Sequence, residues 1–146
     1  GTTSGIQSIW GSSSNDVWIG TGSGDILRYN GTMWYNVDWP DYSDSESVCR
    51  LPTAIEGFWG TSETVFFHNS IQLVMWDGVE FYVLGYWPGE TVEIDGSTYC
   101  NQRLRINAIW GNSVNEVFIA VSEEDYSTDR CDEYLLWWDG SNFHWF

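Results

Sequence analysis

Lysine is absent from the chain, and its five basic residues, all arginines, are outnumbered by 21 acidic residues, so the formal net charge is −16. A protein of this charge repels phosphate backbones, which argues against nucleic-acid binding. No apolar run reaches the roughly 20 residues that a membrane-spanning helix needs. No segment keeps helical periodicity over about ten residues, which argues against a helical fold.

Catalytic signatures are missing as well. The chain has no Gly-x-Ser-x-Gly motif, no phosphate-binding glycine-rich loop and no lysine for Schiff-base chemistry. His68 and His144 have no nucleophile motif beside them. A carboxylate pair for glycoside hydrolysis stays open in so acidic a chain, although no pair stands out. We therefore expect a protein that is not an enzyme and carries no cofactor.

Two groups of acidic residues, within 41–46 and within 125–132, have a spacing that could place oxygens around calcium. Neither group follows the calcium-loop pattern of helix–loop–helix sites. Acid-rich loops are more often simply solvated, so no metal site is predicted.

The chain is rich in aromatic residues, and these mark an internal repeat. Aromatics make up 18% of the sequence, with 11 tryptophans, which argues against disorder. A Trp-Gly pair occurs at Trp10, Trp59 and Trp110, about 50 residues apart. Each copy ends in an aromatic–Asn/Asp–Gly–x–x–aromatic pattern, which predicts a hairpin because Asn-Gly and Asp-Gly supply the positive φ of a tight turn. The turn glycines are Gly31, Gly78 and Gly140.

Each copy is predicted to form four short strands. They cover 6–10, 17–21, 26–29 and 34–37 in the first copy, 54–59, 65–68, 71–76 and 80–84 in the second, and 106–110, 117–121, 133–138 and 142–146 in the third. Four strands in a repeat of about 40–50 residues are typical of a propeller blade. We expect one all-β domain of three units, about 6–39, 53–87 and 106–146, with insertions at 38–53, 85–105 and 122–132.

The first strand of each copy has a small residue two positions before its tryptophan: Ser8, Gly57 or Ala108. Small side chains fit where innermost strands crowd around an axis, and apolar residues on both sides suit a strand between neighbouring sheets. The repeated tryptophans are therefore expected to pack between units. Three equivalent polar residues either line an axial channel or lie at packing edges: Gln7, Glu56 and Asn107.

The order of Trp-Gly, polar loop, Asp/Glu-Val-aromatic and closing hairpin resembles a bacterial β-propeller repeat, common in secreted proteins of myxobacteria and related environmental bacteria. The resemblance covers nearly the whole chain apart from the insertions. It implies a partial propeller of three four-stranded antiparallel blades. It also implies an extracellular or cell-surface location, reached after removal of a signal, and it implies fold far better than activity.

Three blades cannot close a ring, since propellers have about four to eight, so an open wedge leaves an apolar surface at each end. Large exposed apolar patches are rare on soluble monomers. Three arrangements resolve this: a six-bladed ring of two chains, an excerpt of a longer propeller, or a filament. We predict a structural module that assembles with copies of itself. The alternative is a carbohydrate-binding, lectin-like module.

The insertions are expected at one end of the sheets, here called the insertion face, because alternate loops of an antiparallel meander emerge on the same side. This face carries most of the acidic residues. Its aromatic and arginine side chains could pin the loops, contact another copy or bind glycans, because Tyr, Trp and Arg dominate interface hot spots. The residues are Trp39, Tyr42, Tyr86, Trp87, Tyr99, Tyr126, Arg50, Arg103, Arg105 and Arg130.

Three cysteines fall in the insertions. Cys49 and Cys100 occupy equivalent linker positions, and Cys131 lies in the long loop of the third copy. Because the chain has no Cys-x-x-Cys motif, these cysteines suit a protein of an oxidising compartment better than a zinc site. We predict a Cys100–Cys131 disulfide, which leaves Cys49 either to pair with another chain or to stay a free thiol. The alternative is three reduced thiols. The start at Gly1, without Met, is expected of a processed secreted protein or a domain excerpt.

Overall fold

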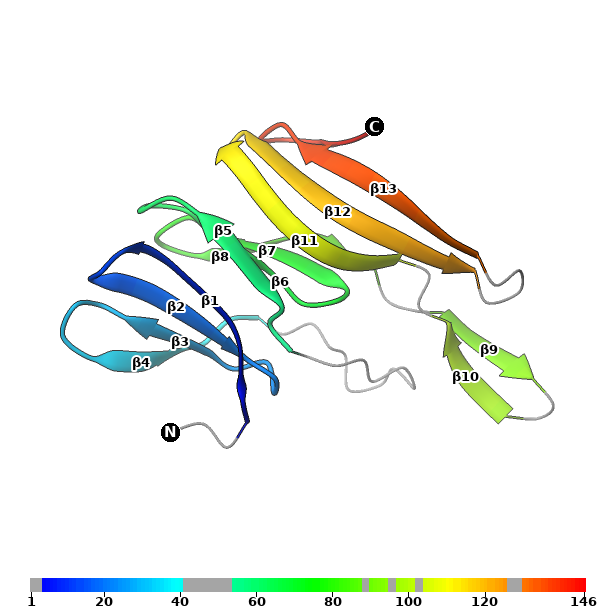
Figure 1. The fold of residues 1–146 in the computed structure, drawn as a ribbon, viewed down its shortest axis with the longest axis horizontal. Helices are drawn as coiled ribbons and strands as arrows, with labels where there is room; N and C mark the ends of the chain where they lie inside the picture. The colour runs from blue at the N-terminus through cyan, green and yellow to red at the C-terminus, as the bar shows by residue number, and fades with distance from the viewer. Residues whose placement is uncertain (1–3, 41–53, 88–89, 95–96, 102–103, 126–129) are drawn as a thin grey trace.

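A computed structural model describes residues 4–40, 54–87, 90–94, 97–101, 104–125 and 130–146, which form strands, turns and loops but no helix. Three antiparallel sheets of four strands follow one another, each a meander in chain order (Figure 1). The predicted all-β class and its three four-stranded antiparallel sheets are confirmed. None of the described segments is a helix long and apolar enough to cross a membrane.

The strands are numbered in chain order. Sheet 1 contains β1 (Ile6–Ser13), β2 (Asp16–Thr21), β3 (Ile26–Tyr29) and β4 (Trp34–Val37). Sheet 2 contains β5 (Gly57–Gly60), β6 (Val65–His68), β7 (Gln72–Trp76) and β8 (Phe81–Tyr86). Sheet 3 contains β11 (Leu104–Ser113), β12 (Glu116–Asp125), β13 (Arg130–Trp138) and β14 (Phe143–Trp145). A separate hairpin pairs β9 (Glu90–Ile94) with β10 (Ser97–Asn101).

Strand boundaries match the predicted ones best in the short strands: β3, β4 and β6 span the predicted residues. Sheet 3 differs, because β12 runs on to Asp125 and β13 begins at Arg130. Most of the segment predicted as an insertion at 122–132 is therefore paired strand, in which main-chain hydrogen bonds satisfy the backbone polar groups. The predicted insertion at 85–105 likewise contains the β9–β10 hairpin.

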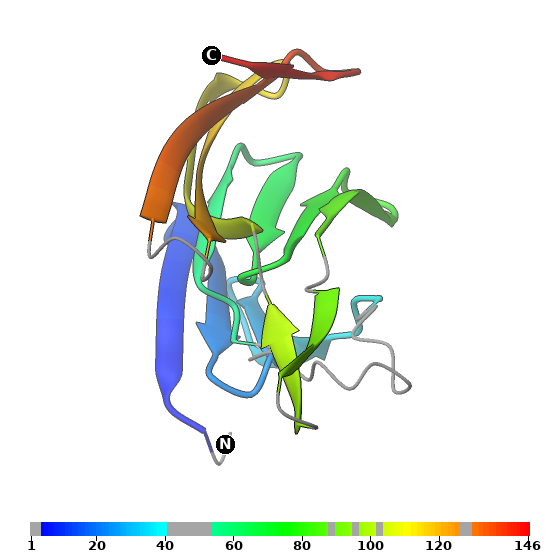
Figure 2. The same ribbon diagram turned by 90° about the vertical axis from the view of Figure 1, so that its right-hand side faces the viewer.

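The first strands of consecutive sheets lie next to each other: β1 contacts β5, and β5 contacts β11. The termini lie at opposite ends of this row of sheets (Figures 1 and 2). β1 and β11 also share their irregularities. The register shifts between Gly11 and Ser13 in β1, and between Gly111 and Ser113 in β11. The first and third copies therefore share this backbone detail, whereas the register of β5 with β6 shows no such shift.

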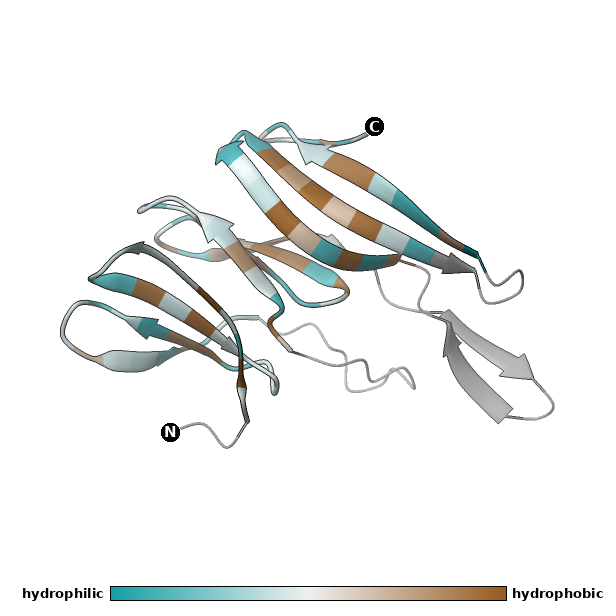
Figure 3. Cartoon of the chain, viewed as in Figure 1, coloured by the Kyte–Doolittle hydropathy of each residue, from teal (hydrophilic) through white to brown (hydrophobic). Residues whose placement is uncertain are grey.

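Two apolar cores fill the spaces between the sheets. Phe66 and Phe67 of β6 are both fully buried, and they point into different cores because successive side chains of a strand face opposite sides. Figure 3 shows the apolar residues spaced along β12. The buried residues of core A, between sheets 1 and 2, are Trp18, Ile26, Ile55, Val65, Phe67 and Val74. Those of core B, between sheets 2 and 3, are Phe66, Leu73, Ile106, Val117, Ile119, Val121 and Leu136.

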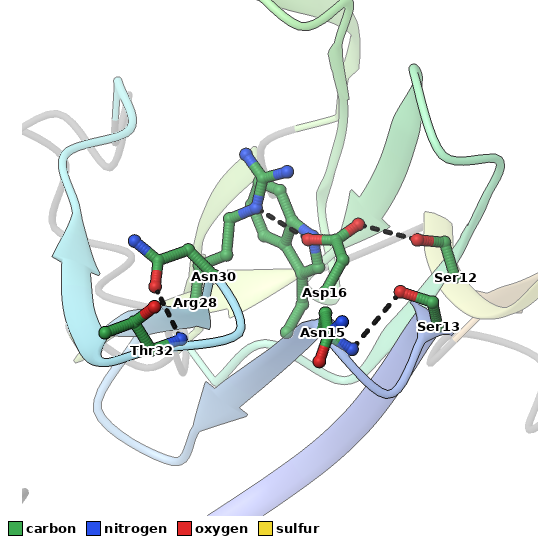
Figure 4. Close-up of polar contacts among 8 residues, drawn as sticks. Ser12, Ser13, Asn15, Asp16, Arg28, Asn30 and Thr32 are labelled. Atoms are coloured by element: carbon green, nitrogen blue, oxygen red, sulfur yellow. Dashed lines mark hydrogen bonds and ion pairs between the residues drawn. The ribbon is translucent and has the colours of Figure 1, made fainter.

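The three turns that join the third and fourth strands share one geometry. Their glycines have positive φ values of 89°, 96° and 93°, as predicted: Gly31, Gly78 and Gly140. The residue before each glycine is Asn30, Asp77 or Asp139, and its side-chain oxygen accepts hydrogen bonds from the two backbone N–H groups that follow the glycine. Figure 4 shows the bond from the N–H of Thr32 to Asn30. Asn and Asp suit this position because they form such bonds without distorting the turn.

Asp139 is expected to titrate well below the usual pH range of an aspartate. A hydrogen bond from Nε2 of His144, at 2.7 Å, and then the backbone N–H groups of Asn142 and Ser141 lower the pKa of Asp139 from 3.8 to about 2. Because the folded pKa is the lower one, the carboxylate stabilises the fold above the unfolded pKa. That contribution is lost as the pH falls from 3.8 toward 2. In a carboxyl ¹³C NMR titration, His144→Ala should move the Asp139 midpoint upward.

Asp77 is the control for this titration. Backbone N–H groups of Glu80 and Val79 lower the pKa of Asp77 in the same way, but its turn has no histidine. The His144→Ala substitution should therefore leave the Asp77 midpoint where it is. An Asp139 midpoint unmoved by the substitution would show that the turn amides alone set it.

Candidate functional site

The outer face of sheet 1, which points away from sheet 2, is apolar and only partly covered. Register places Ile9, Ile19 and Leu27 in one row across the strands, and Val17, Tyr29 and Trp34 in the next. Ile9 is 68% exposed and Trp34 is also exposed. Ile6, at the start of β1, is 66% exposed. An apolar sheet face of this kind is rare on a soluble monomer without a partner.

The outer face of sheet 3, at the other end of the molecule, is aromatic. Trp110 is 61% exposed, and its ring stacks on that of Phe118 with centroids 6.2 Å apart. Phe146 lies against Phe118 and Trp137, and is itself exposed. The rows on this face also contain Ala108, Ala120, Leu135 and His144.

The three repeated tryptophans occupy equivalent positions in different surroundings. Trp10 packs partly buried against core A. Trp59 packs against core B and covers Gly111 of the next sheet so closely that a Cβ on that glycine would lie 2.7 Å from the ring. Within the described residues, no sheet packs on the face of sheet 3 that carries Trp110. The expectation that these residues pack between units therefore holds for the first two tryptophans and not for Trp110.

An isoleucine four residues before each tryptophan shows the opposite trend. Ile55 is 0% exposed and packs on sheet 1, where a Cβ on Gly20 would lie 2.5 Å from its own Cβ. Ile106 is 1% exposed and belongs to core B. Ile6 is the first residue of β1, and no other described sheet packs on it, so it is exposed. Of the three repeated tryptophans, the one on sheet 3 is exposed, and of the three repeated isoleucines, the one on sheet 1 is exposed.

Two aromatic residues of the predicted insertion face pack on their own chain. Trp39 donates from Nε1 to the carbonyl oxygen of Gly24 at 3.0 Å and meets Phe67 edge-on. Trp87 packs against core B and meets Phe143 at 6.1 Å between ring centroids. These two tryptophans fasten the linkers to the sheets. Tyr42 and Tyr126 lie outside the described residues, as do the side chains of Tyr86 and Tyr99.

The arginines of the insertion face that the structure describes are exposed and paired. Arg105 contacts Glu56 at 3.3 Å, and Arg130 contacts Asp132 at 3.2 Å. Glu56 also accepts a hydrogen bond from Ser70 at 3.1 Å. Exposed pairs of this kind contribute little stability. Gln7 and Asn107 are exposed, whereas Arg50 and Arg103 lie outside the described part of the chain.

The predicted disulfide between Cys100 and Cys131 is not seen. Cys131 is an exposed free thiol near the start of β13, where it pairs across the ladder with Glu124. Cys100 lies in β10, which pairs with β9 and not with sheet 3. Cys49 lies outside the described residues.

A polar cluster on sheet 1 was missed by the sequence reasoning. Nε of Arg28 donates to Asp16 at 2.7 Å (Figure 4). The guanidinium of Arg28 lies 4.7 Å from the ring centre of Trp18. Ser12 and Nε1 of Trp18 donate to the same carboxylate. A signal existed, because Arg28 interrupts a run of apolar residues in β3 whose equivalents in the other copies are Met75 and Trp137.

The two histidines have different surroundings. His68 is buried under Gly57, and burial lowers its pKa, which keeps it neutral. His144 is held by the Asp139 turn. In the described ranges, no cluster of three or more His, Cys, Asp or Glu side chains could hold a metal ion.

No protein-family model matches the chain, and a comparison with curated proteins finds no match. The resemblance to bacterial propeller repeats therefore stays a prediction.

Proposed function

We propose that this protein is an extracellular structural module without enzymatic activity, a three-bladed sector of propeller-like architecture that assembles with copies of itself. The observation that carries the proposal is the exposure of repeat-equivalent residues at the two ends. Ile6 is exposed where Ile55 and Ile106 are buried. Trp110 is exposed where Trp10 and Trp59 pack between sheets.

The two outer faces complement each other. Within the chain, the tryptophan side of one sheet packs on the isoleucine side of the next, and this happens twice, in core A and core B. The outer face of sheet 3 is a tryptophan side, and that of sheet 1 is an isoleucine side. A second copy placed with its sheet 1 on sheet 3 of the first would repeat the internal packing, with Trp110 over Gly11 as Trp59 lies over Gly111.

Contacts of this kind are head-to-tail. They generate a closed ring if the rotation between copies closes, and an open filament if it does not. Burial of apolar surface drives the association, at about 25 cal/mol per Å². The net charge of −16 opposes non-specific clumping and keeps such assemblies soluble.

The test is the mass of the native particle, measured by sedimentation over a range of concentrations with reductant present, so that the exposed Cys131 forms no bridges. The wild-type chain is expected to give particles heavier than one chain. Ile9→Asp on sheet 1 and Trp110→Asp on sheet 3 should each block one face and give single chains, because a carboxylate in an apolar interface has no partner. Val79→Asp, at an exposed apolar position of the sheet 2 turn, is the matched control and should assemble normally.

Mixing the two blocked variants separates head-to-tail contact from like-to-like contact. Ile9→Asp keeps an intact sheet 3 face and Trp110→Asp keeps an intact sheet 1 face, so the mixture should form two-chain particles and nothing larger. If like faces met instead, only one of the two substitutions would have an effect, and mixing would restore nothing. A wild-type chain that stays single at every concentration would refute self-assembly.

A further inference from the structure

Core A and core B differ at one position of the repeat. In sheet 2 this position is Met75, which packs against core B. In sheet 1 this position is Arg28. Beside Arg28, the space between β3–β4 of sheet 1 and the β7–β8 turn of sheet 2 opens into a cavity of about 500 Å³. A second hollow of about 370 Å³ shares Arg28, Trp76 and Val79 with the first.

Arg28 is held in place by its neighbours. Its Nε is bound to Asp16, its guanidinium stacks on Trp18, and the carboxylate of Asp16 is fixed in turn by Ser12. Figure 4 shows the two terminal nitrogens of Arg28 directed away from Asp16. A half-buried ion pair is weak evidence of stabilisation, since an apolar side chain of similar volume does as well or better. Sheet 2 has such a side chain at the equivalent position, which points to a binding role for Arg28.

The lining of the cavity combines rings with polar groups of both kinds. Tyr35, Trp76 and Phe81 supply aromatic surface, Arg28 supplies donors, and Asp38 supplies an acceptor. The negative face of an aromatic ring attracts the C–H groups of a sugar ring. Sugar hydroxyls both donate and accept hydrogen bonds, which matches donors and acceptors set side by side.

Charge narrows the choice of ligand. Asp16 already neutralises Arg28, and the carboxylates of Asp38 and Glu80 line the same cavity. The lining therefore disfavours a negatively charged ligand. A cation would be attracted by these carboxylates and by the net charge of −16, so charge disfavours only an anionic ligand. The size of the cavity falls in the ordinary range of small-molecule pockets, about 300–1,000 Å³.

We propose that the cavity between β3–β4 of sheet 1 and the β7–β8 turn of sheet 2 binds a mono- or disaccharide without negative charge, with Arg28 donating to its hydroxyls and the aromatic residues of the cavity stacking on its ring. This site is separate from the two outer faces. It differs from the predicted glycan contact on the insertion face, whose described tryptophans pack on the sheets.

The test is a calorimetric titration of the full chain with neutral sugars, namely glucose, galactose, mannose, N-acetylglucosamine and their common disaccharides. Glucuronic acid and glucosamine serve as charged counterparts. At least one neutral sugar should bind with a dissociation constant of about 1 mM or lower. Glucuronic acid should bind more weakly than glucose, whereas glucosamine should bind at least as well, because the uncompensated charge of the lining is negative. Because assembly could perturb the heats, the titration is repeated in the Trp110→Asp background, where sugar binding should persist whether or not the chain assembles.

Two variants and two matched controls locate the site. Arg28→Met, which copies the residue of sheet 2, and Tyr35→Ala should each weaken binding about tenfold or more, the loss expected of a hydrogen bond from a charged donor or of a stacked ring. Arg130→Met and Tyr134→Ala remove the same residue types from sheet 3 and should leave affinity unchanged. Tyr35 and Tyr134 are similarly exposed, at 39% and 36%, so neither substitution should unfold the chain. Absence of binding by every neutral sugar, tighter binding of glucuronic acid than of glucose, or full affinity in both cavity variants would each rule the proposal out.

Discussion

Replacing Trp59 with alanine is expected to lower the free energy of unfolding by about 3 kcal/mol, whereas the same change at Trp110 should cost less than about 1 kcal/mol. Trp59 packs against core B and covers Gly111, so its removal leaves a cavity between sheets 2 and 3. Trp110 occupies the equivalent place in the repeat but is 61% exposed, so little burial is lost. Urea denaturation followed by far-ultraviolet circular dichroism measures both.

Both substitutions are best made in the Ile9→Asp background, because association raises apparent stability and would mix the two effects. Ile9 is 68% exposed, so the background change itself should cost little. Equal losses at the two tryptophans would mean that Trp59 does not join the sheets as the structure shows. If the wild-type chain assembles as proposed, the ranking should reverse there, with Trp110→Ala reducing particle mass more than Trp59→Ala in any chains that remain folded.

The second large effect is expected at Gly20. A Cβ there would lie 2.5 Å from Cβ of Ile55 and 2.6 Å from Oγ of Ser8. That hydroxyl donates to the carbonyl oxygen of Ile55 at 2.6 Å, so the linker into sheet 2 is tied down at this point. Gly20→Val should lower the free energy of unfolding by about 3 kcal/mol, because overpacking forces the linker off the sheet.

Ala120 is the matched control for Gly20, because it occupies the equivalent position on the outer face of sheet 3. No linker covers it within the described chain, so Ala120→Val should cost less than about 1 kcal/mol in urea. The proposed head-to-tail contact places Ile6 of a second copy there, as Ile55 lies on Gly20, so Ala120→Val should also reduce particle mass. A Gly20→Val variant as stable as the wild type would show that Ile55 can leave the sheet without cost.

The repeat was readable from sequence because its signals are local. An Asn-Gly or Asp-Gly pair needs only its own side chain and a positive φ, so the turns at Gly31, Gly78 and Gly140 were located to the residue. The β9–β10 hairpin was missed although Asp95-Gly96 stands between two alternating segments, because it has no counterpart in the other copies. Comparing the copies of the repeat identifies elements that occur in each copy and misses an element that occurs in one copy alone.

Side-chain surroundings were harder to predict than strands. Trp39 and Trp87 were recognised as notable, but the sequence does not say that one reaches back to Gly24 and the other lies on Gly85. Such contacts depend on the path of a linker over a sheet, and the repeat period of the sequence does not indicate that path. Arg28 was overlooked for a different reason: its partner Asp16 is on the neighbouring strand, and the pair is evident only once β2 and β3 are in register.

The repeated packing of core A and core B bears on how such chains can lengthen. Each internal junction brings together the same two kinds of surface, so a gene duplication that adds one further unit would bury one old end and expose an identical new one. Chains of different unit number would thus keep compatible ends and could mix in one assembly. Size could then change over evolution without any new recognition surface having to arise.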